Sequence, residues 1–131
     1  MPNEIHPMQA IIDGMSAAWQ RDRAATQMTL GGLIATLEAL PHDTDISEIG
    51  HPHSYRGYYC DLAFEQTGGS IKASDLLALC KSIMGRVFAG YKGGDYMMGA
   101  NTPIWIANYG DCGVKIMSLR ADGTFETAED A

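Results

Sequence analysis

Apolar residues in this chain repeat with two different periods, and this mixture limits the folds that the chain can adopt. Three segments have apolar side chains at the spacing of an α-helix: 8–19, 29–40 and 70–85. Other segments alternate or form short apolar runs, as strands do: 46–49, 58–65, 103–109, 114–119 and a short one around Phe125. In 131 residues, this order predicts a single α+β domain in which two to three helices pack on one antiparallel sheet.

The helix expected at 29–40 has clear boundary signals. Thr29 is a good N-cap, and Pro41 ends the apolar stripe. Gly31 and Gly32 fall in the first turn, where they either cost stability or allow another backbone to approach closely.

Glycine, proline and small polar residues mark the connections. We expect turns or loops at 41–45, 50–54, 67–70, 89–103, 110–113 and 122–123. Ser70 or Ser74 could cap the third helix, and Gly85 is expected to end it.

The chain divides at the start of the second helix. We expect an N-terminal helical extension at 1–27 and a single α+β ligand-binding domain at 28–131. The apolar stripe of the extension could pack on a partner subunit or on the chain's own core.

Several classes of protein are excluded or disfavoured. No apolar run reaches the roughly 20 residues of a membrane helix. The first residues lack the charged and apolar regions of a signal peptide. The three cysteines are widely spaced and odd in number, so they do not form a disulfide framework. We therefore expect a cytoplasmic protein without a membrane segment.

The charge distribution favours a small anionic ligand over a polymeric nucleic acid. The net charge is −7, which disfavours binding along a phosphate backbone. Residues 50–120 nevertheless carry a net charge of +2, between flanking segments of −5 and −4. A pocket for a small anion fits this pattern, although solvated faces of different sign would produce it too.

The densest polar and aromatic cluster is His53-Ser54-Tyr55-Arg56-Gly57-Tyr58-Tyr59. A guanidinium is a planar donor that matches phosphate oxygens, and tyrosine rings can stack on a nucleobase. The alternative is that the tyrosines belong to the core and Arg56 pairs with a carboxylate such as Asp61 or Glu65.

A second cluster follows at 88–96 and is rich in glycine. Glycines let backbone N–H groups approach a ligand, Lys92 adds a positive charge, and Asp95 could accept from ribose or an amino group. The spacing matches neither a Walker loop nor a dinucleotide-binding fingerprint. A structural role in a tight turn is an equally good interpretation.

Metal binding and catalysis have weak support. His51 and His53 could lie on one side of an extended segment, joined by His42 or Cys60, but no metal-binding motif is present. Cys60 and Cys80 lie on apolar stripes and are expected in the core. We expect no metal, no cofactor and no catalytic residue.

Three segments together resemble a known family: HSYRGYYCDLAFE (53–65), FAGYKGGDYMMG (88–99) and TPIWIANYGDCG (102–113). With the preceding MTLGGLIATLEALPHDT (28–44), they resemble the type-one Thoeris anti-defence family of phage proteins. The resemblance covers about residues 28–120 and leaves the N-terminal extension outside it. The family also leads us to expect an arginine near residue 28, which this chain lacks.

The resemblance implies a molecular sponge and not an enzyme. Such proteins bind, without cleaving, the cyclic ADP-ribose-type signals that bacterial TIR proteins make, so the signal cannot activate its effector. Some members also bind cyclic oligonucleotide signals. The resemblance further implies a homo-oligomer, either a dimer or a higher assembly such as a hexamer, with pockets between subunits. It would act in the cytoplasm of the infected bacterial host.

The residue chemistry and the resemblance together predict a binding site. The expected ligand-binding residues are Tyr55, Arg56, Phe88, Tyr91, Lys92, Asp95, Asn101 and Arg120. The arginines would contact phosphate, Phe88 and Tyr91 would stack on a base, and the acidic and amide side chains would hydrogen bond ribose or base edges. This hypothesis requires the two clusters to converge in the folded protein.

Two other functions remain open at this point. One is a protein-interaction module, such as an inhibitor of a host protein. The other is a small nucleotide-processing enzyme, whose turnover would depend on His53 or Asp95.

Overall fold

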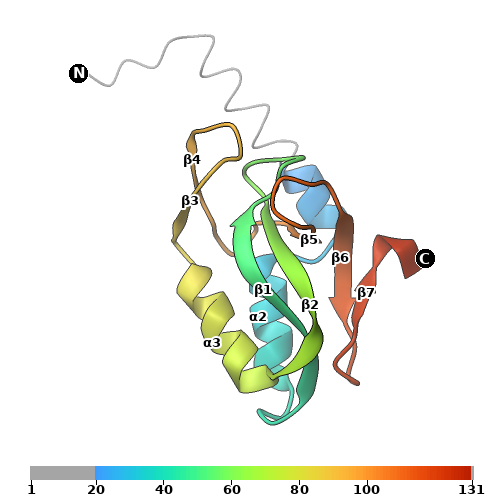
Figure 1. Cartoon of the computed structure of the whole chain (residues 1–131). Helices are drawn as coiled ribbons and strands as arrows, with labels where there is room; N and C mark the ends of the chain where they lie inside the picture. The colour runs from blue at the N-terminus through green and yellow to red at the C-terminus, as the bar shows by residue number, and fades with distance from the viewer. Residues whose placement is uncertain (1–19, 131) are drawn as a thin grey trace.

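The computed structural model of this chain describes residues 20–130 (Figure 1). Helical residues 20–26 lead into the following elements: α2 (Leu30–Ala39), β1 (Asp45–Ser54), β2 (Leu62–Lys72), α3 (Ala73–Ile83), β3 (Val87–Ala89), β4 (Asp95–Met97), β5 (Ile104–Ile106), β6 (Val114–Leu119), β7 (Phe125–Thr127) and the 3-10 helix η1 (Ala128–Asp130). The helical stripe expected at 8–19 lies outside the described residues.

The described residues form one α+β domain, as expected, but the sheet is mixed. The five-stranded sheet has the order β1-β2-β5-β6-β7, and β3 pairs with β4 in a separate two-stranded sheet. The β2–β5 pair is parallel, and the other pairs are antiparallel. The expectation of a wholly antiparallel sheet was wrong at this pair. The long connection through α3 and the β3–β4 hairpin returns the chain in the direction that parallel pairing needs.

Helix α2 begins and ends where the sequence predicts. The Thr29 hydroxyl accepts a hydrogen bond from the Gly32 amide at 3.1 Å, which satisfies one of the unpaired donors of the first turn. Gly31 explains the close approach of a second segment: its amide donates to the Ala100 carbonyl at 2.8 Å. A Cβ on Gly31 would lie 2.8 Å from that same carbonyl oxygen, so a larger residue does not fit.

The core lies between the helices and the sheet. Leu33 and Leu37 of α2 are fully buried, as are Leu76 of α3 and Phe64 of β2. Figure 1 shows α2 and α3 side by side along β1 and β2, with the β3–β4 hairpin at the same end as the loop after β1. Within residues 20–130, no helix has the length and hydrophobicity to cross a membrane.

Helix α3 begins at Ala73, between the starting positions that caps at Ser70 and Ser74 would give. Its N-cap is Lys72, whose side chain makes no capping hydrogen bond, so the expected caps at Ser70 and Ser74 were wrong. The helix follows β2 directly and ends at Ile83, and Gly85 then adopts a left-handed φ of 78°.

Strands β1 and β2 run through segments where loops were expected. Residues 50–54 belong to β1, and residues 67–70 belong to β2. The register shifts between Gly50 and His53, and His51 adopts a positive φ of 48°, so the irregularity is absorbed as a bulge on an edge strand. Backbone hydrogen bonds pair β1 with β2 through these segments, and the periodicity of the side chains does not reveal such pairing.

Conversely, the strand expected at 58–65 starts only at Leu62. Residues 55–61 form a loop, closed by hydrogen bonds from the Tyr55 amide to the Asp61 carbonyl (3.0 Å) and from the Asp61 amide to the Tyr58 carbonyl (2.9 Å). The glycine-rich stretch after α3 is also ordered into strands β3 and β4, with Phe88 opposite Tyr96 in the register.

Candidate ligand-binding pocket

Two loops that are far apart in the sequence meet in the folded chain. They are the Arg-Tyr loop (residues 55–61) and the glycine hairpin (residues 87–97), which comprises β3, β4 and their turn. The Arg56 Cζ lies 4.9 Å from the centroid of the Tyr91 ring, and Tyr59 packs edge-on against Tyr96 at 5.9 Å between ring centroids. The convergence that the sequence hypothesis required is therefore present within one chain.

Between these loops lies a pocket of about 310 Å³. Its volume is at the lower end of the range typical of small-molecule sites, roughly 300–1,000 Å³. The lining residues are Arg23, Arg56, Gly57, Tyr58, Tyr59, Cys60 and Tyr96. The walls thus combine two guanidinium groups with three phenol rings, a composition suited to a planar and anionic molecule.

Arg56 carries a positive charge that no carboxylate in the described residues neutralises. Its Nη1 donates to the Gly110 carbonyl at 2.7 Å, and its side chain is exposed. The ion pairs of the described part of the chain involve other cations. Asp61 binds Arg23, and Glu65 accepts from the Tyr109 amide at 2.9 Å. The alternative in which Arg56 pairs with Asp61 or Glu65 was therefore wrong.

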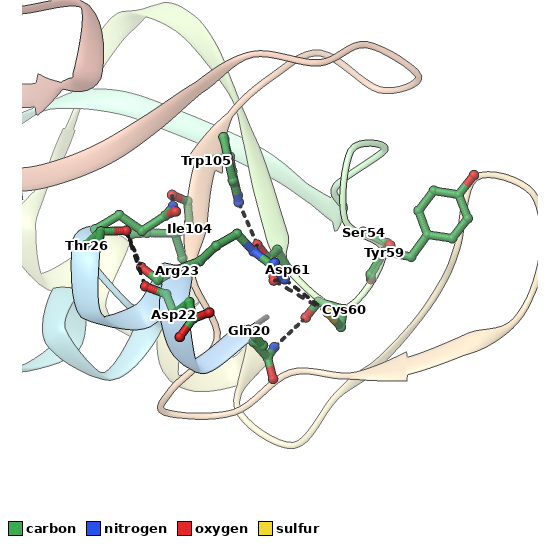
Figure 2. A network of polar contacts seen from close by, with 11 residues as sticks. Gln20, Asp22, Arg23, Thr26, Ser54, Tyr59, Cys60, Asp61, Ile104 and Trp105 are labelled. Carbon is green, nitrogen blue, oxygen red and sulfur yellow. Dashed lines mark hydrogen bonds and ion pairs between the residues drawn. The ribbon is translucent and has the colours of Figure 1, made fainter. Parts of the chain in front are cut away.

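A buried ion pair closes the other side of the pocket (Figure 2). The Arg23 Nε donates to Asp61 Oδ2 at 2.7 Å, and its Nη2 donates to Asp61 Oδ1 at 2.9 Å. Trp105 Nε1 donates to Asp61 Oδ2 at 2.9 Å. Burial alone would lower the pKa of Arg23, but the hydrogen bonds and charge of Asp61 outweigh it and raise the pKa.

Aromatic stacking holds Trp105, which hydrogen bonds Asp61 behind the pocket wall, in place. The Tyr55 ring stacks on the Trp105 indole, with centroids 4.2 Å apart and planes at 10°. The Tyr55 hydroxyl accepts from the Gly113 amide at 3.1 Å, and burial raises the pKa of this phenol. Tyr55 is 4% exposed, so the structure places this expected ligand-binding residue in a small core cluster behind the pocket.

The thiol in the pocket wall is held in its protonated form. Burial raises the pKa of Cys60 to about 11, and the neighbouring Asp61 charge contributes. A thiolate is the nucleophilic form of cysteine, so this thiol is a poor nucleophile at neutral pH. The Gln20 side chain donates to the Cys60 carbonyl at 3.0 Å and ties the helical residues 20–26 to the loop.

The histidines of β1 do not assemble with other metal ligands. The ring Nδ1 of His53 lies 2.7 Å from the His51 carbonyl oxygen, and its Nε2 is buried with no hydrogen bond in the described region. Among residues 20–130, no three His, Cys, Asp or Glu side chains lie close enough together to hold a metal ion.

The remaining expected site residues are spread over the fold. Phe88 is 9% exposed and packs in the main core, with the Arg86 guanidinium 4.6 Å from its ring centroid. Tyr91, Lys92 and Asp95 are exposed on the glycine hairpin.

Asn101 and Arg120 complete the expected set. Asn101 is exposed in the turn before β5. Arg120 follows β6, and its Nη1 donates to the Thr124 hydroxyl and the Phe125 carbonyl, each at 3.3 Å. Figure 1 shows the β6–β7 turn at the opposite end of the sheet from the Arg-Tyr loop, so Arg56 and Arg120 do not meet within one chain.

Two buried polar residues before α2 were not predicted from the sequence, and one of them lines the pocket. Arg23 was assigned to the N-terminal extension, yet it is 8% exposed and forms part of the wall. Gln27 is equally buried, and its side chain donates to the Ile104 carbonyl at 2.8 Å. Both residues continue the i, i+4 spacing from Trp19, and that continuation was the available signal.

No family model matches this chain, and neither the curated proteins nor the solved structures include a match. The chemistry of the pocket is therefore the structural basis for a functional proposal.

Proposed function

We propose that this protein is an anti-defence sponge that binds and sequesters cyclic ADP-ribose-type immune signals, and cyclic oligonucleotide signals, without cleaving them. One observation carries the proposal. Arg56 brings an uncompensated positive charge to the mouth of a pocket walled by Tyr58, Tyr59 and Tyr96. A cyclic nucleotide supplies the phosphate and the planar base that these groups recognise.

Approximate energies are consistent with useful affinity. One charge-assisted contact from Arg56 contributes about 1.5–3 kcal/mol, and a stacked base contributes about 1–3 kcal/mol. Micromolar to nanomolar binding corresponds to roughly −8 to −12 kcal/mol. Burial against a second subunit would supply the rest and exclude water, so we propose a homo-oligomer in the cytoplasm of an infected bacterium.

Binding without reaction is supported by the state of the pocket's thiol. The raised pKa of Cys60, about 11, keeps this thiol protonated at neutral pH. A sponge needs donors and ring faces but no activated nucleophile.

Isothermal titration calorimetry tests the proposal. The wild-type protein would be titrated with cyclic ADP-ribose isomers and with cyclic di- and trinucleotides, and ADP-ribose would serve as the linear control. We expect a saturable signal for at least one cyclic compound. Failure of every cyclic compound to bind would refute the proposed function.

A protein-interaction module is the second candidate, favoured by one exposed apolar feature. Val87 and Met97 are register partners on the glycine hairpin and are 49% and 68% exposed. Met84, just before this hairpin, is 41% exposed. Such a patch suits a protein partner. Affinity capture of a host protein that is lost with Met97→Lys, combined with no small-molecule binding, would favour this function.

A further inference from the structure

The carboxylate of Asp61 is fully buried next to the pocket, and Arg23 occupies both of its oxygens. It also accepts from the Trp105 indole at 2.9 Å, and the Cys60 thiol lies 3.5 Å away as a weaker donor. A buried carboxylate with this many donors is fixed in position. Figure 2 shows these donors converging on Asp61 from the helix, the loop and strand β5.

Asp61 determines how Arg23 is presented to the pocket. The Nε and Nη2 edge of the guanidinium is committed to the carboxylate, while its Cζ lies 3.7 Å from the centroid of the Tyr58 ring. The hydrogen bonds of Arg23 to described residues use Nε and Nη2, and Arg23 lines the pocket. If this guanidinium donates to a ligand in the pocket, Nη1 is therefore the group that does so.

The pocket wall that Arg23 forms differs in charge from the pocket mouth, where Arg56 lies. Arg23 and Asp61 together are neutral, whereas Arg56 has no carboxylate partner among the described residues. A neutral planar donor favours the edge of a base or a carbonyl group over a phosphate, and the uncompensated cation favours the phosphate.

We propose that Asp61 is a positioning residue: it holds the Arg23 guanidinium flat on the Tyr58 ring and neutralises its charge. The pocket wall formed by Arg23 then receives the base of the ligand and not its phosphate. This inference rests on the proposed nucleotide-binding function and deepens it. The helical residues 20–26 are then part of the site, because they supply Arg23 and the Gln20 contact to the loop.

The test compares two probes, cyclic ADP-ribose and inorganic pyrophosphate, by calorimetry. Asp61→Asn keeps an acceptor for Trp105 but leaves Arg23 without its negative partner. We expect this variant to bind cyclic ADP-ribose at least about tenfold more weakly and pyrophosphate at least about threefold more tightly. A purely structural role for Asp61 would not increase pyrophosphate affinity.

A second variant keeps the test decisive if the single substitution prevents folding. Arg23→Met combined with Asp61→Asn leaves no buried charge, and such replacements of a buried pair are often tolerated. This double variant should fold, lose at least about tenfold in cyclic ADP-ribose affinity and bind pyrophosphate as the wild type does. The matched control is Glu38→Gln with Lys81→Met, which removes a half-exposed ion pair between α2 and α3 and should change neither affinity.

The outcomes separate the two proposals. If the wild type binds a cyclic nucleotide and the double variant binds it equally well, the positioning role is refuted and the proposed function stands. If the wild type binds no cyclic nucleotide, the proposed function is refuted. In that case, an unchanged pyrophosphate affinity in Asp61→Asn would also refute the assigned role of Asp61 in setting the charge of the wall.

Discussion

Arg56 and Tyr91 face each other across two loops, with the Arg56 Cζ 4.9 Å from the centroid of the Tyr91 ring. The same guanidinium donates to the Gly110 carbonyl at 2.7 Å, and Tyr91 packs against Tyr109 at 5.7 Å between ring centroids. Two contacts therefore hold this exposed cation in place, and a third holds the Tyr91 ring that it faces. A side chain that is ordered before binding loses less conformational entropy when the ligand arrives.

Replacing Arg56 should separate binding from folding. We expect Arg56→Ala to weaken cyclic ADP-ribose binding by at least about 2 kcal/mol, roughly 30-fold, because a charge-assisted contact is lost. The side chain is exposed, so the thermal midpoint should stay within about 2 °C of wild type. Calorimetry and thermal unfolding would measure the two effects.

The matched control for Arg56 is Lys72→Ala, which removes an exposed cation paired with Asp45 at a distance from the pocket. It should leave binding unchanged. A large fall in thermal stability for Arg56→Ala, with affinity retained, would show that Arg56 serves the fold and not a ligand.

Gly90 lies on the glycine hairpin at a point of close contact with Tyr59 of the Arg-Tyr loop. A Cβ there would lie 2.6 Å from the Gly93 carbonyl oxygen, 2.9 Å from Tyr96 and 3.0 Å from Tyr59. Gly90→Ala should push the glycine hairpin away from the Arg-Tyr loop and weaken binding by about tenfold or more. At Gly99, by contrast, a Cβ would meet no atom of the described residues within 4 Å.

Gly99→Ala is therefore the control for Gly90→Ala, and we expect wild-type affinity for it. Crystal structures or amide chemical shifts of both variants would locate any displacement. Equal affinities for the two alanine variants would contradict the proposed role of the contact between the loops.

Tyr55 should behave as a core residue and not as a ligand contact. Tyr55→Ala removes the ring stacked on Trp105, and we expect a loss of about 3–5 kcal/mol in the free energy of unfolding. Tyr55→Phe keeps the stack but deprives the Gly113 amide of its acceptor, for a loss of about 1 kcal/mol. Denaturant unfolding measures both, and Tyr55→Phe should bind ligand normally. A strong binding defect in stable Tyr55→Phe protein would contradict this assignment.

Cys60, which is half-buried, and Cys80, which is buried, should make the folded protein less stable at alkaline pH. Burial raises the pKa of Cys60 from 9.0 to about 11 and that of Cys80 to about 12. Above pH 9 the unfolded chain loses these protons while the folded chain keeps them, so the free energy of unfolding should fall between about pH 9 and 12. Their contribution is fully present below pH 9.

Urea unfolding across this pH range would measure how steeply the free energy of unfolding falls with pH. Cys80→Ala should make this fall less steep, whereas Cys112→Ser, at an exposed position, should leave it unchanged. An identical alkaline slope in Cys80→Ala and wild type would contradict the assignment to Cys80.

Strong local signals in the sequence located part of the fold. Thr29 and Pro41 bound α2, and the run of Val114–Leu119 predicts β6 to the residue, because capping and apolar runs act over a few neighbouring positions. The β1–β2 ribbon was mispredicted because backbone pairing between strands, not side-chain pattern, carries the chain through Gly50 and Gly68. The parallel β2–β5 pair depends on a crossover that no local signal specifies.

The candidate site, like the fold, could be predicted from the sequence only in part. Arg56 and the glycine hairpin could be identified from composition, since cation, ring and glycine clusters are visible along the chain. The burial of Tyr55 and the separation of Arg120 from Arg56 could not be predicted from the sequence, because both follow from tertiary packing. The partner of Asp61 was also not predicted, since Arg23 lies 38 residues away in the sequence and meets Asp61 only in the folded chain.

The most direct measurement is the recovery of ligand from the protein. Cyclic ADP-ribose isomers would be mixed with an excess of protein, and free ligand would be quantified in a filtrate before and after heat denaturation. We predict that at least one isomer disappears from the filtrate and returns chemically intact after heating. Ligand that stays in the filtrate throughout, or returns as linear ADP-ribose, would contradict sequestration without cleavage.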